Sequence, residues 1–144
     1  MNNLAEQGNT PAILAIEALM NAQFDQDALR ATTETKHYHL KGVYVRSLFI
    51  LAGMMLTGKI HNFESIGILA QGRLRITNGT ESIIVEAPYI TVDTPGVKRL
   101  GYAETDCTFI TVHRTDADSV NEIEDELVSD TFDEFEIKRL RGSL

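Results

Sequence analysis

The sequence predicts a mainly β protein, an antiparallel barrel of the jelly-roll type that is flanked by helices. Between residues 36 and 113 there are about eight short runs of strand-forming residues, separated by turn residues. Segments with helical periodicity precede and follow this region. The chain has 144 residues and 43% apolar content, which is enough to bury one core, so we expect a single domain over residues 1–144.

The first element that we expect is a helix within residues 10–30. Thr10 is a suitable N-cap, and Pro11 suits the first helical position because the first turn leaves its N–H groups unpaired in any case. Apolar side chains then recur at helical spacing and predict one buried face. They are Ile13, Ile16, Leu19, Met20 and Phe24.

The barrel is predicted over residues 36–113. Its strands are KHYHL, VYVRSLFI, GILAQ, RLRIT, ESIIVE, YITV, VKRLGY and CTFITV. The clearest turn signal between them is Asn78-Gly79, for which we expect a type I′ turn with positive φ at both residues. Pro95-Gly96 marks a second turn.

An acidic helical tail is predicted over residues 119–144. Ser119 and Glu122 have the spacing of a capping box. A second helix should begin near Thr131. Residues 115–144, which include this tail, hold ten acidic and three basic side chains, so they carry −7 of the net charge of −8. An acidic surface repels phosphate backbones, and we therefore expect no nucleic-acid partner.

The tail also carries apolar side chains that need a surface to cover them. They either pack on the barrel of their own chain or dock onto a neighbouring subunit, and we treat them as candidates for an oligomer interface. These candidates are Ile123, Leu127, Phe132 and Phe135. A jelly roll with exposed sheet surface favours a homo-oligomer, with a dimer as the expected form.

Composition also bears on the compartment. The single cysteine, Cys107, excludes an internal disulfide and lies in an apolar run, where we expect it to be buried and structural. No apolar run approaches the roughly 20 residues that cross a bilayer, and the first residues do not resemble a secretory signal. We expect a soluble, cytoplasmic protein without a membrane partner.

The segment GKIHNFESIGILAQG, from Gly58 to Gly72, resembles the first conserved motif of the cupin superfamily. In that motif a glycine leads into two histidines one residue apart, then a glutamate, then a turn glycine. Gly58, His61 and Gly72 match it. The run PGVKR, residues 95–99, resembles a shortened form of the second cupin motif. The resemblance implies a cupin-like barrel over roughly residues 40–113.

The sequence departs from the cupin pattern at the positions that bind metal. Phe63 takes the place of the second histidine, and the glutamate place falls near residues 65–67, which leaves only the displaced Glu64. Lys98 and Arg99 stand where the second motif would approach its histidine. The ligand set that the family uses is therefore incomplete.

A narrower resemblance is to small single-domain cupin-like proteins encoded by tailed bacteriophages. It is carried by TGKIHNFESIGILAQG, EAPYITVDTPGVKRLGY, CTFITVH and IEDELVSDTFDEFE. This resemblance implies an accessory protein in the host cytoplasm or the virion, with a phage or host protein as partner.

A metal site remains one interpretation of the histidines. His61 and His113, with Glu64 as the third ligand, would suit a divalent transition metal. One of His37 and His39, which share a strand face, is an alternative third ligand. The competing interpretation is that His61 is a hydrogen-bonded histidine in the mouth of the barrel and that no cofactor is bound.

Arg99 suggests a different kind of site. An inward arginine near His61 and Tyr102 would bind a carboxylate or phosphate through its planar donors. The alternative is a salt bridge from Arg99 to Glu64 or Glu104 at the rim. If the barrel binds a ligand, the expected ligand residues are His61, Glu64, Arg99, Tyr102 and His113.

Two hypotheses of function follow. The first is a non-catalytic, oligomeric accessory protein of a phage that acts by binding another protein. The second is a small metal-dependent cupin enzyme, an isomerase or dioxygenase, that acts on an anionic small molecule. The incomplete ligand set favours the first, and the retained His61 supports the second.

Overall fold

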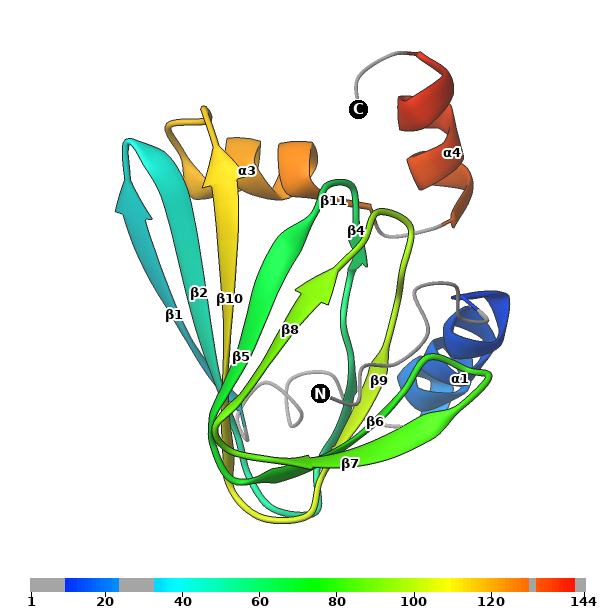
Figure 1. Cartoon of the computed structure of the whole chain (residues 1–144). Helices are drawn as coiled ribbons and strands as arrows, with labels where there is room; N and C mark the ends of the chain where they lie inside the picture. The colour runs from blue at the N-terminus through cyan, green and yellow to red at the C-terminus, as the bar shows by residue number, and fades with distance from the viewer. Residues whose placement is uncertain (1–9, 24–32, 130–131, 142–144) are drawn as a thin grey trace.

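A computed structural model of the chain describes residues 10–23, 33–129 and 132–141, and Figure 1 shows their arrangement. Strands make up about half of the described chain, and most of them form two main antiparallel sheets. The helices are α1 (Thr10–Gln23), α3 (Val120–Leu127) and α4 (Phe132–Leu140). The strands of the first sheet are β1 (Thr33–Leu40), β2 (Gly42–Ile50), β10 (Cys107–Thr115), β5 (Ser65–Gln71) and β8 (Tyr89–Asp93), in that order. Those of the second are β3 (Met55–Thr57), β9 (Leu100–Ala103), β6 (Arg73–Thr77) and β7 (Ser82–Glu86).

A short third sheet joins the barrel to the C-terminal segment. It pairs β4 (Ile60–His61) with β11 (Val128–Ser129), strands that are far apart in the sequence. Each pair of neighbouring strands in the three sheets is antiparallel. The prediction of a mainly β, jelly-roll fold with helices at both ends is confirmed.

One half of the space between the two main sheets is filled with apolar side chains from both of them. This apolar half is made of Ile50, Leu69, Leu74, Ile76, Val85, Ala103 and Cys107, all of them buried. Cys107 is inaccessible and donates weakly to the carbonyl oxygens of Arg73 and Thr105, as expected for a structural cysteine. Burial of such apolar surface is the main source of stability in a domain of this size.

The hairpin between β6 and β7 forms where Asn78-Gly79 predicts it, but the predicted turn type is wrong. Gly79 has a φ of 89°, whereas no described residue other than glycine has a positive φ, so Asn78 cannot occupy the first position of a type I′ turn. The loop has four residues instead of two. The Asn78 side-chain oxygen accepts hydrogen bonds from the N–H groups of Thr80 and Glu81 and shapes it.

The C-terminal segment packs on its own barrel. The N-cap half of the predicted capping box is confirmed, because Ser119 Oγ accepts from the Glu122 N–H. The Glu122 carboxylate accepts from the Asp118 N–H, one residue before the N-cap, and not from the Ser119 N–H of a capping box. Ile123 and Leu127 are buried against Tyr44 of β2. They therefore have almost no surface left for a second subunit.

Helix α4 lies against the loop that follows β8. Phe135 is buried, and its ring occupies the space in front of Gly96, where any Cβ atom would lie 3.1 Å from it. Lys138 donates to the carbonyl oxygen of Val128 and pairs with Glu134 at 3.1 Å. Of the four interface candidates, Ile123, Leu127 and Phe135 thus pack within their own chain, and the side chain of Phe132 lies outside the described residues.

The N-terminal helix begins at Thr10 and is described as far as Gln23, so the rest of the predicted segment, up to residue 30, lies outside the described residues. Ile13 is fully buried, whereas Ile16 is largely exposed. None of the described helices combines the length and the apolar character that crossing a membrane requires.

Candidate functional site

His61 lies at the junction between the barrel and the C-terminal segment. It ends the short strand β4, where its backbone pairs with Val128 of β11. The His61 carbonyl accepts a hydrogen bond of 2.8 Å from the Gly96 N–H, and its ring nitrogen Nδ1 lies 2.9 Å from Ser65 Oγ. These contacts fix both the backbone and the ring orientation of His61.

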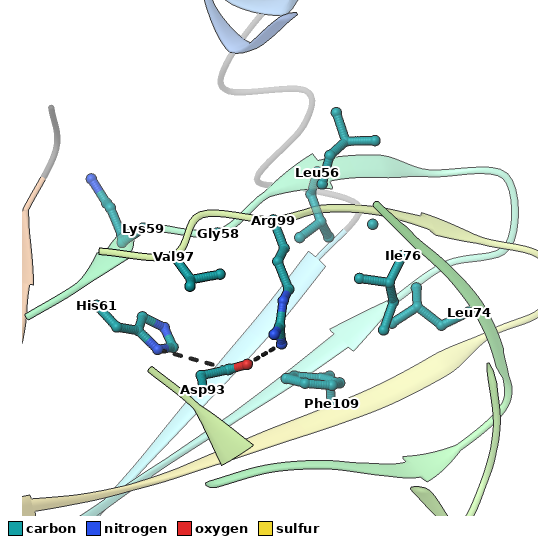
Figure 2. A pocket seen from close by; sticks show the side chains of 12 residues that line it. Leu56, Gly58, Lys59, His61, Leu74, Ile76, Asp93, Val97, Arg99 and Phe109 are labelled. Atoms are coloured by element: carbon teal, nitrogen blue, oxygen red, sulfur yellow. Dashed lines mark hydrogen bonds and ion pairs between the residues drawn. The ribbon is translucent and has the colours of Figure 1, made fainter. Parts of the chain in front are cut away.

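Asp93 and Arg99 form an ion pair beside this imidazole. Asp93 is the last residue of β8, and its Oδ2 atom lies 3.8 Å from His61 Nδ1. Arg99 Nη1 donates to Asp93 Oδ1. Figure 2 shows the Arg99 side chain reaching towards Asp93, with the Phe109 ring beside its tip. The Arg99 Nε donor is buried and has no hydrogen-bond acceptor within the described part of the chain.

The route by which Arg99 reaches the interior differs from the predicted one. We expected Lys98 and Arg99 to alternate in a strand, but β9 begins only at Leu100, and residues 97–99 form a loop. Both basic side chains are mainly enclosed: Lys98 is 2% exposed and the Arg99 side chain 16%. The partner of Arg99 is Asp93 and not a glutamate of the rim, since Glu104 pairs with Arg75.

The first sheet supplies the other side of the site. His113 of β10 is buried and meets His61 edge to face, with ring centroids 5.6 Å apart. Tyr44 stacks on His113 at 5.9 Å. Arg46 follows on the same inner face of β2, directly opposite Thr111 of β10. The half-buried Arg46 side chain makes no hydrogen bond or ion pair with any described residue.

Two neighbouring cavities meet at His61 and Phe109. The larger has a volume of about 220 Å³ and holds Arg46, Thr111 and His113 on its polar side. Its apolar side is formed by Leu48, Leu56, Phe109, Ile123, Leu127 and Val128. The smaller, of about 100 Å³, lies on the side of Asp93 and Arg99 and is the pocket in Figure 2.

The electrostatics of the site keep both imidazoles uncharged at neutral pH. Burial, with Arg99 and Arg46 adding to it, lowers the pKa of His61 from 6.5 to about 4. Burial also lowers the pKa of His113 to about 4, with His61 and Arg46 acting in the same direction and Asp93 opposing. Burial raises the pKa of the Asp93 carboxyl, although the charge of Arg99 opposes this.

The structure brings together three of the five expected ligand residues. His61, Arg99 and His113 surround the cavities, whereas Glu64 is exposed and lines a separate surface hollow beside Phe63 and Pro95. Tyr102 pairs with Met55 and Arg75 in the second sheet and lines neither cavity. The three residues share the interior because each projects from the inner surface of the barrel.

The prediction did not include Arg46, Asp93 and Tyr44. Arg46 is a cation within the otherwise apolar run VYVRSLFI, and a charge that interrupts a strand of this kind is a signal for an inward functional residue. His37 also comes close, since its Nδ1 atom is hydrogen-bonded to Tyr44 Oη. His39 lies directly opposite Tyr44 on the same face of β1 but is exposed.

The side chains do not fit a cupin metal centre. Among the described residues, no three His, Cys, Asp or Glu side chains gather around one point. Position 67, within the expected glutamate place, is a glycine whose Cβ would lie 2.8 Å from the Phe109 ring, so a ligand side chain there would require that ring to move. Arg46 and Arg99, which disfavour protonation of His61, would disfavour a divalent cation for the same reason.

Comparison with solved structures identifies the fold. The chain is similar to an RmlC-like cupin family protein with a double-stranded β-helix fold from Methanocaldococcus jannaschii, at 18% identity over 64% of this chain and 86% of that one, with a TM-score of 0.50. It is also similar to a putative ethanolamine utilization protein from Salmonella typhimurium, at 12% identity over 59% and 71%, with a TM-score of 0.50. A protein of unknown function from Vibrio parahaemolyticus matches at 8% identity over 58% and 88%, with a TM-score of 0.51.

No protein-family model and no curated protein matches the sequence. At these identities the structural likeness shows a cupin-like fold and nothing about activity.

Proposed function

We propose that this chain uses its cupin-like barrel to bind a small organic carboxylate and carries out no chemistry on it. The observation that carries the proposal is the Arg46 guanidinium, which lines the larger cavity without an ion-pair or hydrogen-bond partner among the described residues. A half-buried cation loses part of its hydration, and this loss is costly unless an anion compensates for it. A ligand carboxylate would supply that anion.

Further donors line the two cavities, which meet at His61 and Phe109. Arg99 Nε is buried without an acceptor in the described chain, and Thr111 adds a hydroxyl on the Arg46 side. His61 and His113 are neutral at pH 7, so each imidazole retains one N–H. Guanidinium groups bind planar carboxylates with two parallel hydrogen bonds, which favours this anion over a spherical one.

The same imidazoles are poorly suited to acid–base catalysis. A general base works best when its pKa lies near the operating pH, whereas burial and the two arginines hold the pKa values of His61 and His113 at about 4. The only cysteine of the chain is buried in the apolar half and lines neither cavity. Binding without turnover is the function that this arrangement supports.

The apolar side of the cavity restricts the body of the ligand. Leu48, Leu56, Leu127 and the Phe109 ring also line the larger cavity. A short alkyl or aromatic group would be covered there, whereas a second carboxylate would be buried without a partner. We therefore expect a monocarboxylate with an apolar body rather than a dicarboxylate or phosphate.

This proposal combines parts of the two hypotheses from the sequence. It retains the non-catalytic role of the first and the anionic small molecule of the second. The metal-dependent enzyme finds no support in the donor set around His61. A phage origin, a phage or host protein as partner, and a place in the virion stay predictions.

The proposal is tested by isothermal titration calorimetry of the full chain at pH 7.5 with sodium hexanoate, benzoate, succinate and phosphate. Hexanoate or benzoate should bind in about one equivalent. Arg46→Met should weaken that binding by roughly 10- to 100-fold, because a hydrogen bond to a charged group contributes about 1.5–3 kcal/mol. The methionine keeps the apolar stem and removes the charge.

The matched control is Arg75→Met, which removes an exposed arginine that pairs with Glu104 at 3.0 Å, outside the cavities. It should bind hexanoate or benzoate like the wild type. The proposal is overturned if none of the four anions binds, or if Arg46→Met and Arg75→Met bind equally well.

A further inference from the structure

His113 borders the larger cavity from β10 and lies beside the strand that carries Arg46. Strands β2 and β10 are neighbours in the first sheet (Figure 1), and Arg46 lies directly opposite Thr111. His113 follows two residues later on the same face of β10, opposite Tyr44. Thr111 Oγ1 lies 3.0 Å from His113 Nε2. Arg46, Thr111 and His113 are therefore a compact polar group on two adjoining strands.

The His113 imidazole has a ring nitrogen that a ligand can use. Its Nε2 atom is engaged with Thr111, whereas Nδ1 has no hydrogen-bond partner among the described residues. In His61 the Nδ1 atom is instead held by Ser65 Oγ at 2.9 Å. An imidazolium donates from both ring nitrogens and adds an attraction between charges that the neutral ring lacks. A carboxylate bound to Arg46 would therefore gain a second charged donor if His113 were protonated.

Charged and titratable side chains reach the surroundings of His113 from several elements. Those that line the cavities or contact the two imidazoles are Tyr44, Arg46, Lys59, His61, Asp93 and Arg99. Helix α3 contributes Ile123 and Leu127 to the wall of the larger cavity. His113 also borders a surface hollow with Glu64 and Arg114, both of which are exposed.

A bound carboxylate would reverse the balance of charge at His113. Burial is the main cause that lowers the pKa of His113 from 6.5 to about 4; His61 and Arg46 add to it, and Asp93 opposes. A carboxylate on Arg46 would offset the charge of that arginine and place a negative charge near the ring. An opposite charge within about 4–6 Å shifts a pKa by about 1–3 towards the charged form. At His61 the charge of Arg99 would remain, so His113 is the ring that gains more.

We propose that His113 takes up a proton when the larger cavity binds a carboxylate, so that the ligand lies between the Arg46 guanidinium and the His113 imidazolium. This inference rests on the proposed function and deepens it, because it adds a second charged anchor and makes the affinity depend on pH. The proton comes from the solvent and goes to a ring nitrogen, and no covalent bond to the ligand forms. The site binds its ligand more tightly in mildly acidic solution and releases it as the pH rises.

Isothermal titration calorimetry of the full chain with sodium benzoate, or with hexanoate if it binds more tightly, counts this proton. Binding is measured at pH 6.0 in MES and in Bis-Tris, and at pH 7.5 in HEPES and in Tris, because buffers with different heats of ionisation reveal the protons taken up. A pKa rise in the middle of the range above predicts about half a proton per ligand at pH 6.0 and less than about 0.1 at pH 7.5.

Two variants assign the proton to its ring. His113→Gln keeps a polar side chain that cannot be charged, and it should take up less than about 0.1 proton at pH 6.0. His39→Gln is the matched control, because His39 is exposed and lines neither cavity. It should take up as many protons as the wild type. Far-ultraviolet circular dichroism shows whether both variants are folded.

Nuclear magnetic resonance of the histidine Cε1–H groups gives a second measurement that uses the wild type. The His113 signal, identified by its absence from the spectrum of His113→Gln, should move towards the imidazolium position when the carboxylate is added at pH 6.0. The inference is overturned, with the proposed function intact, if the carboxylate binds without proton uptake at pH 6.0. It is equally overturned if a proton is taken up while the His113 signal stays at the neutral position, because another group would then carry it. Failure of both benzoate and hexanoate to bind overturns the proposed function and this inference together.

Discussion

The two halves of the barrel interior differ in what fills them. In the apolar half, side chains from both main sheets form one cluster, in which Leu69, Ala103 and Cys107 are inaccessible to solvent. In the polar half, Arg46 and His113 border a cavity of about 220 Å³. Both halves are built on the same strands, because inward positions of β2 and β10 change from Ile50 and Cys107 at one end to Tyr44 and His113 at the other.

This difference separates the sources of stability and of function. Close-packed apolar side chains stabilise the fold, whereas unpaired donors and an unfilled cavity do not. Strands β2 and β10 run through both halves, so the packed apolar half can hold the polar half in a fixed geometry. The polar half can then keep groups that a folded chain would otherwise avoid. The apolar half therefore provides stability, and the polar half is suited to binding a ligand.

The largest effect that tests this comparison is a leucine truncation made once in each half. Leu69→Ala should lower the free energy of unfolding by about 3–5 kcal/mol, because the inaccessible Leu69 side chain leaves a void in a packed cluster. Leu127→Ala should cost about 2 kcal/mol, since Leu127 already borders the larger cavity. Urea denaturation measures both, and equal losses would contradict the distinction between the halves.

The pH dependence of stability provides a second, smaller effect that belongs to the polar half. The pKa values of His61 and His113 are about 4 in the folded chain and 6.5 in the unfolded chain, so the unfolded chain binds more protons between these values. Stability should be constant above pH 6.5 and fall towards pH 4, by up to about 1.4 kcal/mol per pH unit for each imidazole.

Asp93 contributes with the opposite sign just above pH 3.8, because burial raises its pKa in the folded chain. The test is therefore made between pH 5 and 7.5, by urea denaturation of the wild type and of His113→Gln. The variant should show about half of the wild-type slope. A wild-type curve that is flat over this range would mean that the imidazoles are not desolvated as the structure indicates.

Much of the fold was predictable because it follows from local patterns. Alternation of apolar residues predicted the strands, and Ser119 with Glu122 predicted the start of α3. Asn78-Gly79 predicted a hairpin but not the length of its loop, because the loop length depends on the register in which the two strands pair. What local patterns do not contain is the order of the strands across the sheet.

The site was less predictable for the same reason. His61, Arg99 and His113 were expected to contribute, but Arg46 and Asp93 reach them only through strand neighbours that are distant in the sequence. The choice between the inner and the outer face also depends on the completed barrel. Strand alternation offers two faces and does not say which one is enclosed, and this left Tyr102 among the candidates.

The smallest expected effect concerns the stability of Arg46→Met, the variant that should lose ligand binding. In the absence of ligand, Arg46 is a half-buried cation without a described partner, in a site where Arg99 is a second cation. Replacing it with methionine should leave the free energy of unfolding unchanged or raise it by up to about 1 kcal/mol, because an uncompensated charge is removed and the apolar stem is kept. Urea denaturation at pH 7.5 without carboxylate measures this, with Arg75→Met as the reference. A loss of more than about 1 kcal/mol would show that Arg46 supports the fold, so that its place in the barrel could not be explained by a ligand.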